Sequence, residues 1–369
     1  MKNKKLIKLS TIVIAGLLVL GLALVGCEGE GPGEPTPADE LYGAGASFPY
    51  PLYTSWIDAY YNESGIQVSY EAIGSGGGID AIIAQTVDFA GSDAIMSEED
   101  EALAEAAGGP ILHIPMTSGA VAVIFNVPGF GSSDIRLTGD VLADIFAKEI
   151  FTWDHPDIVD LNPTLSSVSE NITVCHRSDG SGTTYIFTNY LSKVSTSWNA
   201  TYGFGKSIDW AGDLGGEKNA GVAALVAGNE YSIGYVELAY AIENDLAYCL
   251  LKNPYGNWIE PSLESTSAST EGITLPDDMK IMITNTDAVN GYPICGFTWV
   301  LAYVNQTDLS VGLALVDYLW WCIHEGQEDE YSAALLYARL STDAVAKAEA
   351  LIESLEYDGD SIKDILDSL

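Results

Sequence analysis

The sequence has few basic residues. Lys and Arg together number 15, against 52 Asp and Glu, and the formal net charge is −37. A chain with this balance repels polyanions, which excludes nucleic acids and anionic lipid surfaces as partners. The acidic surface fits either solubility or a salty habitat. It also repels small anions at long range, although physiological salt screens that field over about 8 Å.

Histidine is scarce as well. The four histidines lie in no H-E-x-x-H or triad-like pattern, and no Cys/His spacing matches a zinc site. Ser181, in the segment DGSGTT, lacks the G-x-S-x-G context of a hydrolase nucleophile. The same segment lacks the lysine of a nucleotide-binding P-loop. We therefore expect no metal, no cofactor and no catalysis, and an enzyme stays only a rival hypothesis.

Long hydrophobic runs are absent except near the N-terminus. Four lysines in residues 1–10 precede an uncharged run over residues 11–26, a pattern typical of an export signal. A membrane-anchor helix is the alternative, because the run is close to the shortest that spans a bilayer. The ending LALVGC looks like a bacterial lipobox. We predict a signal peptide over residues 1–26, a lipidated Cys27, and a flexible acidic Pro/Gly tether up to residue 40.

Four further cysteines follow, at Cys175, Cys249, Cys295 and Cys322. An exported chain permits disulfides, and four cysteines allow three pairings. Apolar neighbours favour buried free thiols equally, so the sequence does not choose between the two states.

Aromatic residues are abundant, with 8 Trp and 20 Tyr in 369 residues, which excludes disorder for most of the chain and suggests about two domains. Helical and strand patterns alternate, as in α/β proteins. We expect helices directly after the Gly/Ser-containing segments 45–49, 74–78 and 179–183, over 133–150 with Thr138 as N-cap, and through most of the C-terminal third. Strands are expected over 67–73, 120–127 and 248–251.

Three of these helices thus begin beside Gly/Ser-rich turns. The first turn of a helix leaves N–H groups without partners, and the helix dipole adds about half a positive charge there. Such an end binds an oxyanion without a cationic side chain. The recurrence of this arrangement, each time with a Ser or Thr hydroxyl, indicates an anion site.

Five ordered motifs carry a family resemblance: GAGASFPYPLYTSW, YEAIGSGGGI, VDFAGSDAIMS, HRSDGSGTTYIFTNYLSKV and GGEKNAGVAALV with YSIGYVELAYA. Through them residues 41–369 resemble the phosphate-binding lipoproteins of ABC-type phosphate importers, which are periplasmic-type binding proteins. The resemblance implies an α/β, two-lobed periplasmic-binding-protein fold, with a ligand cleft between lobes joined by two crossing strands. Lobe one would comprise residues 41–124 plus 295–369, and lobe two residues 125–294. The implied partners are inorganic phosphate and the importer's permease and ATPase subunits, with membrane attachment only through the N-terminal lipid.

The resemblance also implies the phosphate ligands: Ser47, Phe48 through its backbone N–H, Ser75, Asp93, Arg177, Ser181, Gly182 and Thr183. Asp179 would hold Arg177 in place. A guanidinium suits this role because it matches two phosphate oxygens at once.

Asp93 is the residue expected to set specificity. Phosphate carries at least one proton at neutral pH and sulfate carries none, so a carboxylate accepts a hydrogen bond from phosphate and repels sulfate. A binding protein for another tetrahedral oxyanion, sulfate or molybdate, is the alternative function. A purely structural surface lipoprotein is a further rival.

Overall fold

The computed structural model describes residues 34–369, so the predicted signal peptide and Cys27 lie outside the described residues. The backbone N–H of Ala38 donates to the Ser310 carbonyl at 2.8 Å, and Glu40 begins the first strand. The folded body therefore begins before residue 40, where we predicted the tether to end. In the described part, no helix is long and apolar enough to cross a membrane.

A nine-stranded sheet forms the centre of the folded body, in the order β2-β1-β3-β12-β4-β8-β6-β7, with β9 also paired to β4. Its strands are β1 Glu40–Gly45, β2 Gln67–Ala72, β3 Phe89–Ser92, β4 Ile111–Asn126, β6 Thr173–Arg177, β7 Leu214–Gly216, β8 Ser232–Glu237, β9 Ala247–Tyr248 and β12 Cys295–Tyr303. Two small sheets join β5 Arg136–Leu137 with β10 Leu250–Lys252 and β11 Trp258–Ile259, and β13 Glu356–Tyr357 with β14 Asp360–Ser361.

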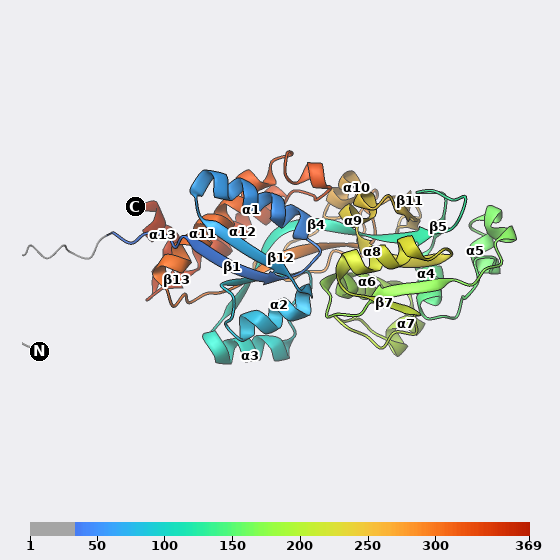
Figure 1. Ribbon diagram of the computed structural model, residues 1–369, viewed down its shortest axis with the longest axis horizontal. Coiled ribbons are helices and arrows are strands. Elements are labelled where there is room, and N and C mark those ends of the chain that lie inside the picture. Colours follow the sequence, from blue (N-terminus) through green and yellow to red (C-terminus); the bar gives the residue numbers. More distant parts are fainter. Residues whose placement is uncertain (1–33) are drawn as a thin grey trace, which may run out of the picture. The chain divides into compact units, whose positions relative to one another are not determined.

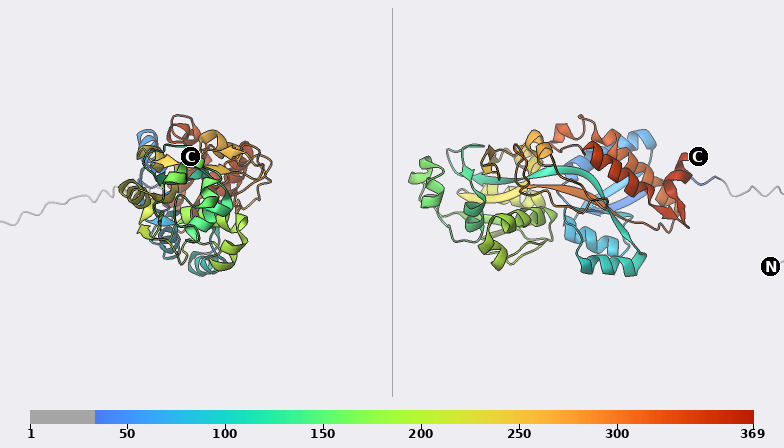
Figure 2. Two further views of the ribbon diagram at one scale, coloured as in Figure 1. Left: turned by 90° about the vertical axis from the view of Figure 1, so that its right-hand side faces the viewer. Right: turned by 180° about the vertical axis from the view of Figure 1, so that it is seen from behind.

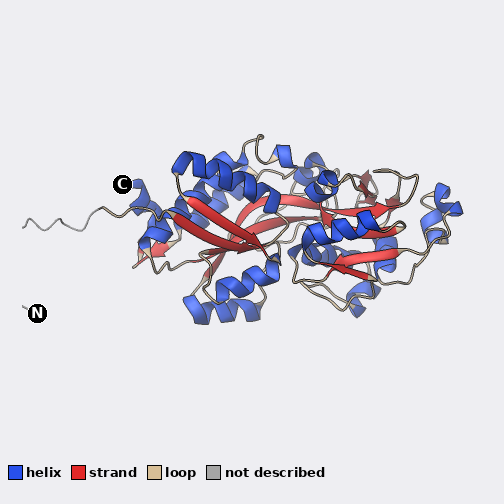
Figure 3. Cartoon of the chain, in the orientation of Figure 1, coloured by secondary structure: helices blue, strands red, loops and turns tan. Residues whose placement is uncertain are grey.

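Helices cover the sheet, as expected for layered α/β packing; Figure 3 shows them in blue around the red strands. They are α1 Tyr50–Ser64, α2 Gly74–Ile83, α3 Glu98–Gly108, α4 Gly139–Phe146, α5 Pro156–Val159, α6 Gly182–Val194, α7 Thr196–Thr201, α8 Lys218–Gly228, α9 Leu238–Glu243, α10 Leu263–Ala268, α11 Leu309–Ile323, α12 Thr342–Glu353 and α13 Ile362–Asp367. Short 3₁₀ helices span Pro163–Ser167, Glu325–Gln327 and Ala333–Leu335.

Strand β4, with 16 residues, is the longest strand of the described part and changes its partner along its length. It pairs with β12 from Ile111 to Ala120 and with β8 from Val121 to Asn126, always antiparallel. Figures 1 and 2 show β4 and β12 passing between a lobe that contains α1, α2 and α11 and a lobe that contains α4, α6 and α8. The fold is thus a two-lobed α/β fold. The lobe boundaries at residues 124 and 294 stay a prediction; the partner change occurs slightly earlier.

Three local predictions were wrong. The segment 133–150 is not one helix, because β5 occupies Arg136–Leu137 before α4 starts behind its Thr138 N-cap. The expected strand over 248–251 is interrupted at Cys249, whose N–H bonds to the Val123 carbonyl at 2.9 Å. The second helix starts at Gly74 itself rather than after Gly78.

The four cysteines of the described part are buried free thiols. Burial raises the pKa of each thiol above its ordinary value. They therefore stay protonated at neutral pH and act as small apolar core residues.

Candidate functional site

The eight residues predicted to bind an anion lie together, and all are buried. Helices α1 and α2 of one lobe, and α6 and α8 of the other, begin around them. We call this set the central cluster; it consists of Ser47, Phe48, Ser75, Asp93, Arg177, Ser181, Gly182 and Thr183.

The two lobes touch at the starts of α2 and α6. The Gly182 N–H donates to Ser75 Oγ at 3.1 Å, and the Gly76 N–H donates to the Gly180 carbonyl at 2.9 Å. A Cβ added at Gly182 would lie 2.5 Å from both Ser75 Oγ and Asp93 Oδ2. A Cβ at Gly74, where φ is +82°, would lie 2.6 Å from Asp179 Oδ2. Glycines at these positions are thus needed for the close approach of the two backbones.

Arg177 is the cation of the central cluster and is 3% exposed. Its Nε donates to Asp179 Oδ1 at 2.7 Å, a second nitrogen donates to Asp179 Oδ2, and Nη1 lies 3.4 Å from Thr183 Oγ1. Burial raises the pKa of Asp179, but the hydrogen bonds and charge of Arg177 outweigh burial and leave that pKa below its ordinary value. The carboxylate therefore stays ionised and fixes the plane of the guanidinium.

Asn219, the second residue of α8, belongs to the site, although sequence reasoning did not single it out. Its Nδ2 donates to Ser47 Oγ and to Thr183 Oγ1, both at 3.1 Å, and its Oδ1 accepts the Glu237 N–H at 3.0 Å. Because an amide NH₂ only donates, both hydroxyl oxygens must accept from it. Each hydroxyl hydrogen is then free to donate to an anion.

Asp93 follows β3 and is 1% exposed. Its Oδ1 accepts from Thr298 Oγ1 at 2.8 Å, and its Oδ2 lies 3.4 Å from Ser75 Oγ. Burial raises the pKa of Asp93 to about 7, even though Thr298, Arg177 and Ser75 all favour the ionised form. A carboxyl group with such a pKa can share a proton with a ligand near neutral pH.

The peptide between Ser47 and Phe48 supplies a buried backbone donor. The Ser47 carbonyl accepts from Tyr240 Oη at 2.6 Å, and the Phe48 carbonyl accepts from Tyr337 Oη at 2.7 Å. Within residues 34–369 the Phe48 N–H has no acceptor. This donor joins the hydroxyls of Ser47 and Thr183 as groups that can bind an anion.

Ser181 is the N-cap of α6, and its Oγ accepts the Thr184 N–H at 3.0 Å. Its hydroxyl hydrogen has no acceptor in the described part and can also serve an anion. The site as a whole presents donors from helix starts, one guanidinium and one carboxyl group. In residues 34–369 no three His, Cys, Asp or Glu side chains group as metal ligands would.

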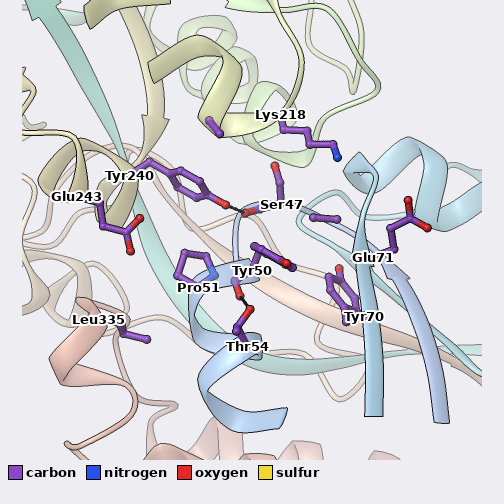
Figure 4. A pocket seen from close by; sticks show the side chains of 12 residues that line it. Ser47, Tyr50, Pro51, Thr54, Tyr70, Glu71, Lys218, Tyr240, Glu243 and Leu335 are labelled. Atoms are coloured by element: carbon purple, nitrogen blue, oxygen red, sulfur yellow. Dashed lines mark hydrogen bonds between the residues drawn. The ribbon is translucent and has the colours of Figure 1, made fainter. Parts of the chain in front are cut away.

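A cavity of about 590 Å³ adjoins the central cluster and shares Ser47 with it (Figure 4). It is lined by side chains of both lobes: Ser47, Tyr50, Pro51, Thr54, Tyr70, Glu71, Ala72, Lys218, Ala220, Tyr240, Glu243 and Leu335.

Comparison with known proteins identifies the family of this chain. Residues 30–315 match the family model of the PBP superfamily domain. The phosphate-binding protein PstS of Pasteurella multocida is 39% identical over 317 residues, which cover 85% of this chain and 90% of that protein. The PstS of Methanocaldococcus jannaschii is 34% identical over 349 residues, covering 86% and 90%.

Solved structures agree on the fold. The high-affinity periplasmic phosphate-binding protein PfluDING, solved with bound phosphate, superposes with a TM-score of 0.68 at 21% identity, covering 84% of this chain and 93% of that chain. The chain therefore belongs to the PBP superfamily and, within it, to the PstS family of phosphate-binding proteins.

Proposed function

We propose that this protein binds inorganic phosphate outside the cytoplasm and delivers it to the permease and ATPase subunits of an ABC-type importer. The observation that carries the proposal is the composition of the central cluster, where hydroxyl and N–H donors and Arg177 surround a site that also contains Asp93. The relatives from Pasteurella multocida and Methanocaldococcus jannaschii, which are phosphate-binding proteins by name, and the bound phosphate in PfluDING support it.

The donors suffice for binding despite the net charge of −37. A hydrogen bond to a charged group contributes roughly 1.5–3 kcal/mol net, and micromolar affinity requires about −8 kcal/mol. The hydroxyls of Ser47, Ser181 and Thr183, the Phe48 N–H and two N–H groups of Arg177 together exceed this need before the ordering of the site and the closure of the lobes are subtracted.

The Asp93 carboxyl group favours phosphate over sulfate or molybdate. The ionised carboxylate accepts a hydrogen bond from the protonated oxygen of HPO₄²⁻. A fully deprotonated oxyanion instead presents a lone pair and a like charge to the carboxylate. Sulfate or molybdate binding is therefore the second candidate function and not the first.

The protein acts as a carrier and not as an enzyme in this proposal. The central cluster has no histidine base beside Ser181, whose Oγ accepts the Thr184 N–H as the N-cap of α6. We further propose that Cys27 carries a lipid anchor and that the residues between Cys27 and Ala38 link it to the folded body. Mass spectrometry of the mature N-terminus tests the anchor, and a chain that starts at Met1 or lacks the lipid contradicts it.

Calorimetric titration of the purified protein tests the ligand. We expect phosphate to bind with micromolar or tighter affinity and sulfate to bind at least about a hundredfold more weakly. Equal binding of the two anions favours the alternative oxyanion function. If phosphate neither binds nor raises the thermal stability of the protein, a structural lipoprotein is favoured instead.

A further inference from the structure

The cavity beside Ser47 carries three charged side chains, and two of them are acidic. Glu71 and Glu243 belong to opposite lobes, and Lys218 is the only cation among the lining residues. In Figure 4 the Lys218 ammonium extends toward the side of the cavity on which Glu71 lies. An anion that enters through this cavity thus passes one positive charge before it reaches Ser47.

Lys218 holds a backbone conformation that suits glycine. Its φ is +62°, in the left-handed region that side chains with a Cβ rarely adopt. In this conformation its N–H donates to Asp179 Oδ1 at 3.1 Å, the same oxygen that accepts from Arg177 Nε. The position is therefore tied to the guanidinium, and the next residue, Asn219, contacts the hydroxyls of the cluster. A long cationic side chain stands where glycine would be less strained.

The Lys218 ammonium also differs from the other lysines of the described part. Within residues 34–369 it makes no hydrogen bond and no ion pair. Lys252 lies over the Trp258 ring, 5.8 Å from the centroid. The remaining described lysines all donate to oxygen acceptors: Lys148, Lys193, Lys206, Lys280, Lys347 and Lys363. Lys218 alone combines an uncommitted ammonium with a place in the wall of the cavity.

We propose that Lys218 is an entry residue, which attracts the incoming phosphate dianion to the cavity before the anion reaches the buried donors. This inference rests on the proposed function. The whole chain repels phosphate, but screening limits that repulsion to about 10 Å, so a single nearby cation can dominate the final approach. At low ionic strength, where screening is weak, a unit charge that acts on a dianion over about 10 Å in water changes the association rate roughly threefold to fivefold.

Rapid-mixing binding of radiolabelled phosphate measures this effect directly. We expect Lys218→Gln and Lys218→Gly each to lower the association rate constant roughly threefold to fivefold at about 20 mM salt, with a difference that nearly vanishes at about 0.5 M salt. The dissociation rate should change little. Lys218→Arg should keep the wild-type rate, and Glu71→Gln should raise it.

The control is Lys252→Gln, which removes the same charge from a lysine that lines no part of this cavity. It should leave the association rate unchanged. The inference is overturned if both Lys218 variants associate as fast as the wild type at low salt. It is also overturned if the reduction of the association rate constant is as large at high salt as at low salt, because such a reduction indicates a change of shape and not of charge. Lys218→Gly suits the left-handed backbone and keeps the test valid if Lys218→Gln folds poorly. Failure of the wild-type protein to bind phosphate would reject the proposed function instead.

Discussion

Tyr240 Oη donates a hydrogen bond to the Ser47 carbonyl at 2.6 Å, and this bond joins the two lobes. The Ser47 carbonyl and the Phe48 N–H belong to one planar trans peptide, so they point in opposite directions. A tyrosine that fixes the carbonyl therefore also fixes the direction of the Phe48 N–H, which has no acceptor in residues 34–369. Tyr240 thus positions a donor of the central cluster from the other lobe.

We expect Tyr240→Phe to weaken phosphate binding about tenfold, because one buried hydrogen bond contributes about 1 kcal/mol and the freed peptide loses its orientation. Calorimetry measures the change. Tyr255→Phe is the matched control, since Tyr255 is 58% exposed and lies outside the cavity. Equal affinity of Tyr240→Phe and wild type would show that the peptide is held by other contacts.

Asn219 gives a sharper test of hydroxyl orientation. In Asn219→Asp the group that donates to Ser47 and Thr183 becomes an acceptor, so both hydroxyls turn toward it and present lone pairs to the ligand. We expect a loss of phosphate affinity of at least about a hundredfold, and a smaller loss of about tenfold in Asn219→Ala, where the hydroxyls stay free to turn. If the Asp variant binds as well as the Ala variant, the amide does not set the hydroxyl directions.

The residues of the central cluster could be selected from the sequence because they lie in short local motifs. Ser75 and Thr183 each stand beside a glycine at the start of a helix, and Ser47 lies shortly before the start of α1. The chemistry of helix ends indicates an anion at such positions. Arg177 and Asp179 are two residues apart, so their pairing is also local.

The positioning residues could not be predicted because they act across the fold. Thr298 reaches Asp93 from β12, and Tyr240 reaches Ser47 from α9. Neither has a local pattern that distinguishes it from an ordinary strand or helix residue. The start of α2 was missed because glycine disfavours a helix. Here the approach of another segment of the chain favours glycine, since a Cβ at Gly76 would lie only 3.1 Å from Gly180 Cα.

The guanidinium of Arg177 should be needed for its shape as well as its charge. We expect Arg177→Ala to weaken phosphate binding by at least about 2 kcal/mol, and Arg177→Lys to recover only part of this, because a lysine cannot donate two parallel hydrogen bonds. Arg339→Ala is the control, since Arg339 forms a salt bridge with the exposed Asp329. Wild-type affinity in Arg177→Ala, measured by calorimetry, would reject the assigned ligand position.

Asp93→Asn should relax the discrimination against sulfate. An amide neither repels a fully deprotonated oxyanion nor accepts the proton of phosphate as strongly. We expect sulfate to compete with phosphate at least about tenfold better than in the wild type. Asp88→Asn, at a half-buried carboxyl group outside the cluster, is the control. Unchanged sulfate exclusion in competition assays would contradict the role of Asp93.

The pH dependence of stability follows from the same residue. Burial raises the pKa of Asp93 to about 7, above the value of about 3.9 in an unfolded chain. Folding thus favours the neutral carboxyl group. Its contribution to the free energy of unfolding is fully present below about pH 4 and is lost as pH rises to about 7. The shift corresponds to at most about 4 kcal/mol for the ligand-free protein.

Denaturant unfolding at several pH values tests this sign. Asp93→Asn should gain stability relative to the wild type as pH rises from about 4 to about 8. Burial is the main cause of the raised pKa of Glu237 and the charge of Asp93 a minor one, so most of the contribution of Glu237 cancels in the comparison. A stability difference that does not depend on pH would show that Asp93 is already ionised at low pH in the folded protein.

A crystal structure of the protein with phosphate tests the central claim most directly. The account predicts the anion between the starts of α1, α2 and α6, with oxygens within hydrogen-bonding distance of Ser47, Ser75, Thr183 and Arg177, and one protonated oxygen facing Asp93. Phosphate bound elsewhere, or bound in this place without contact to Arg177, would contradict it.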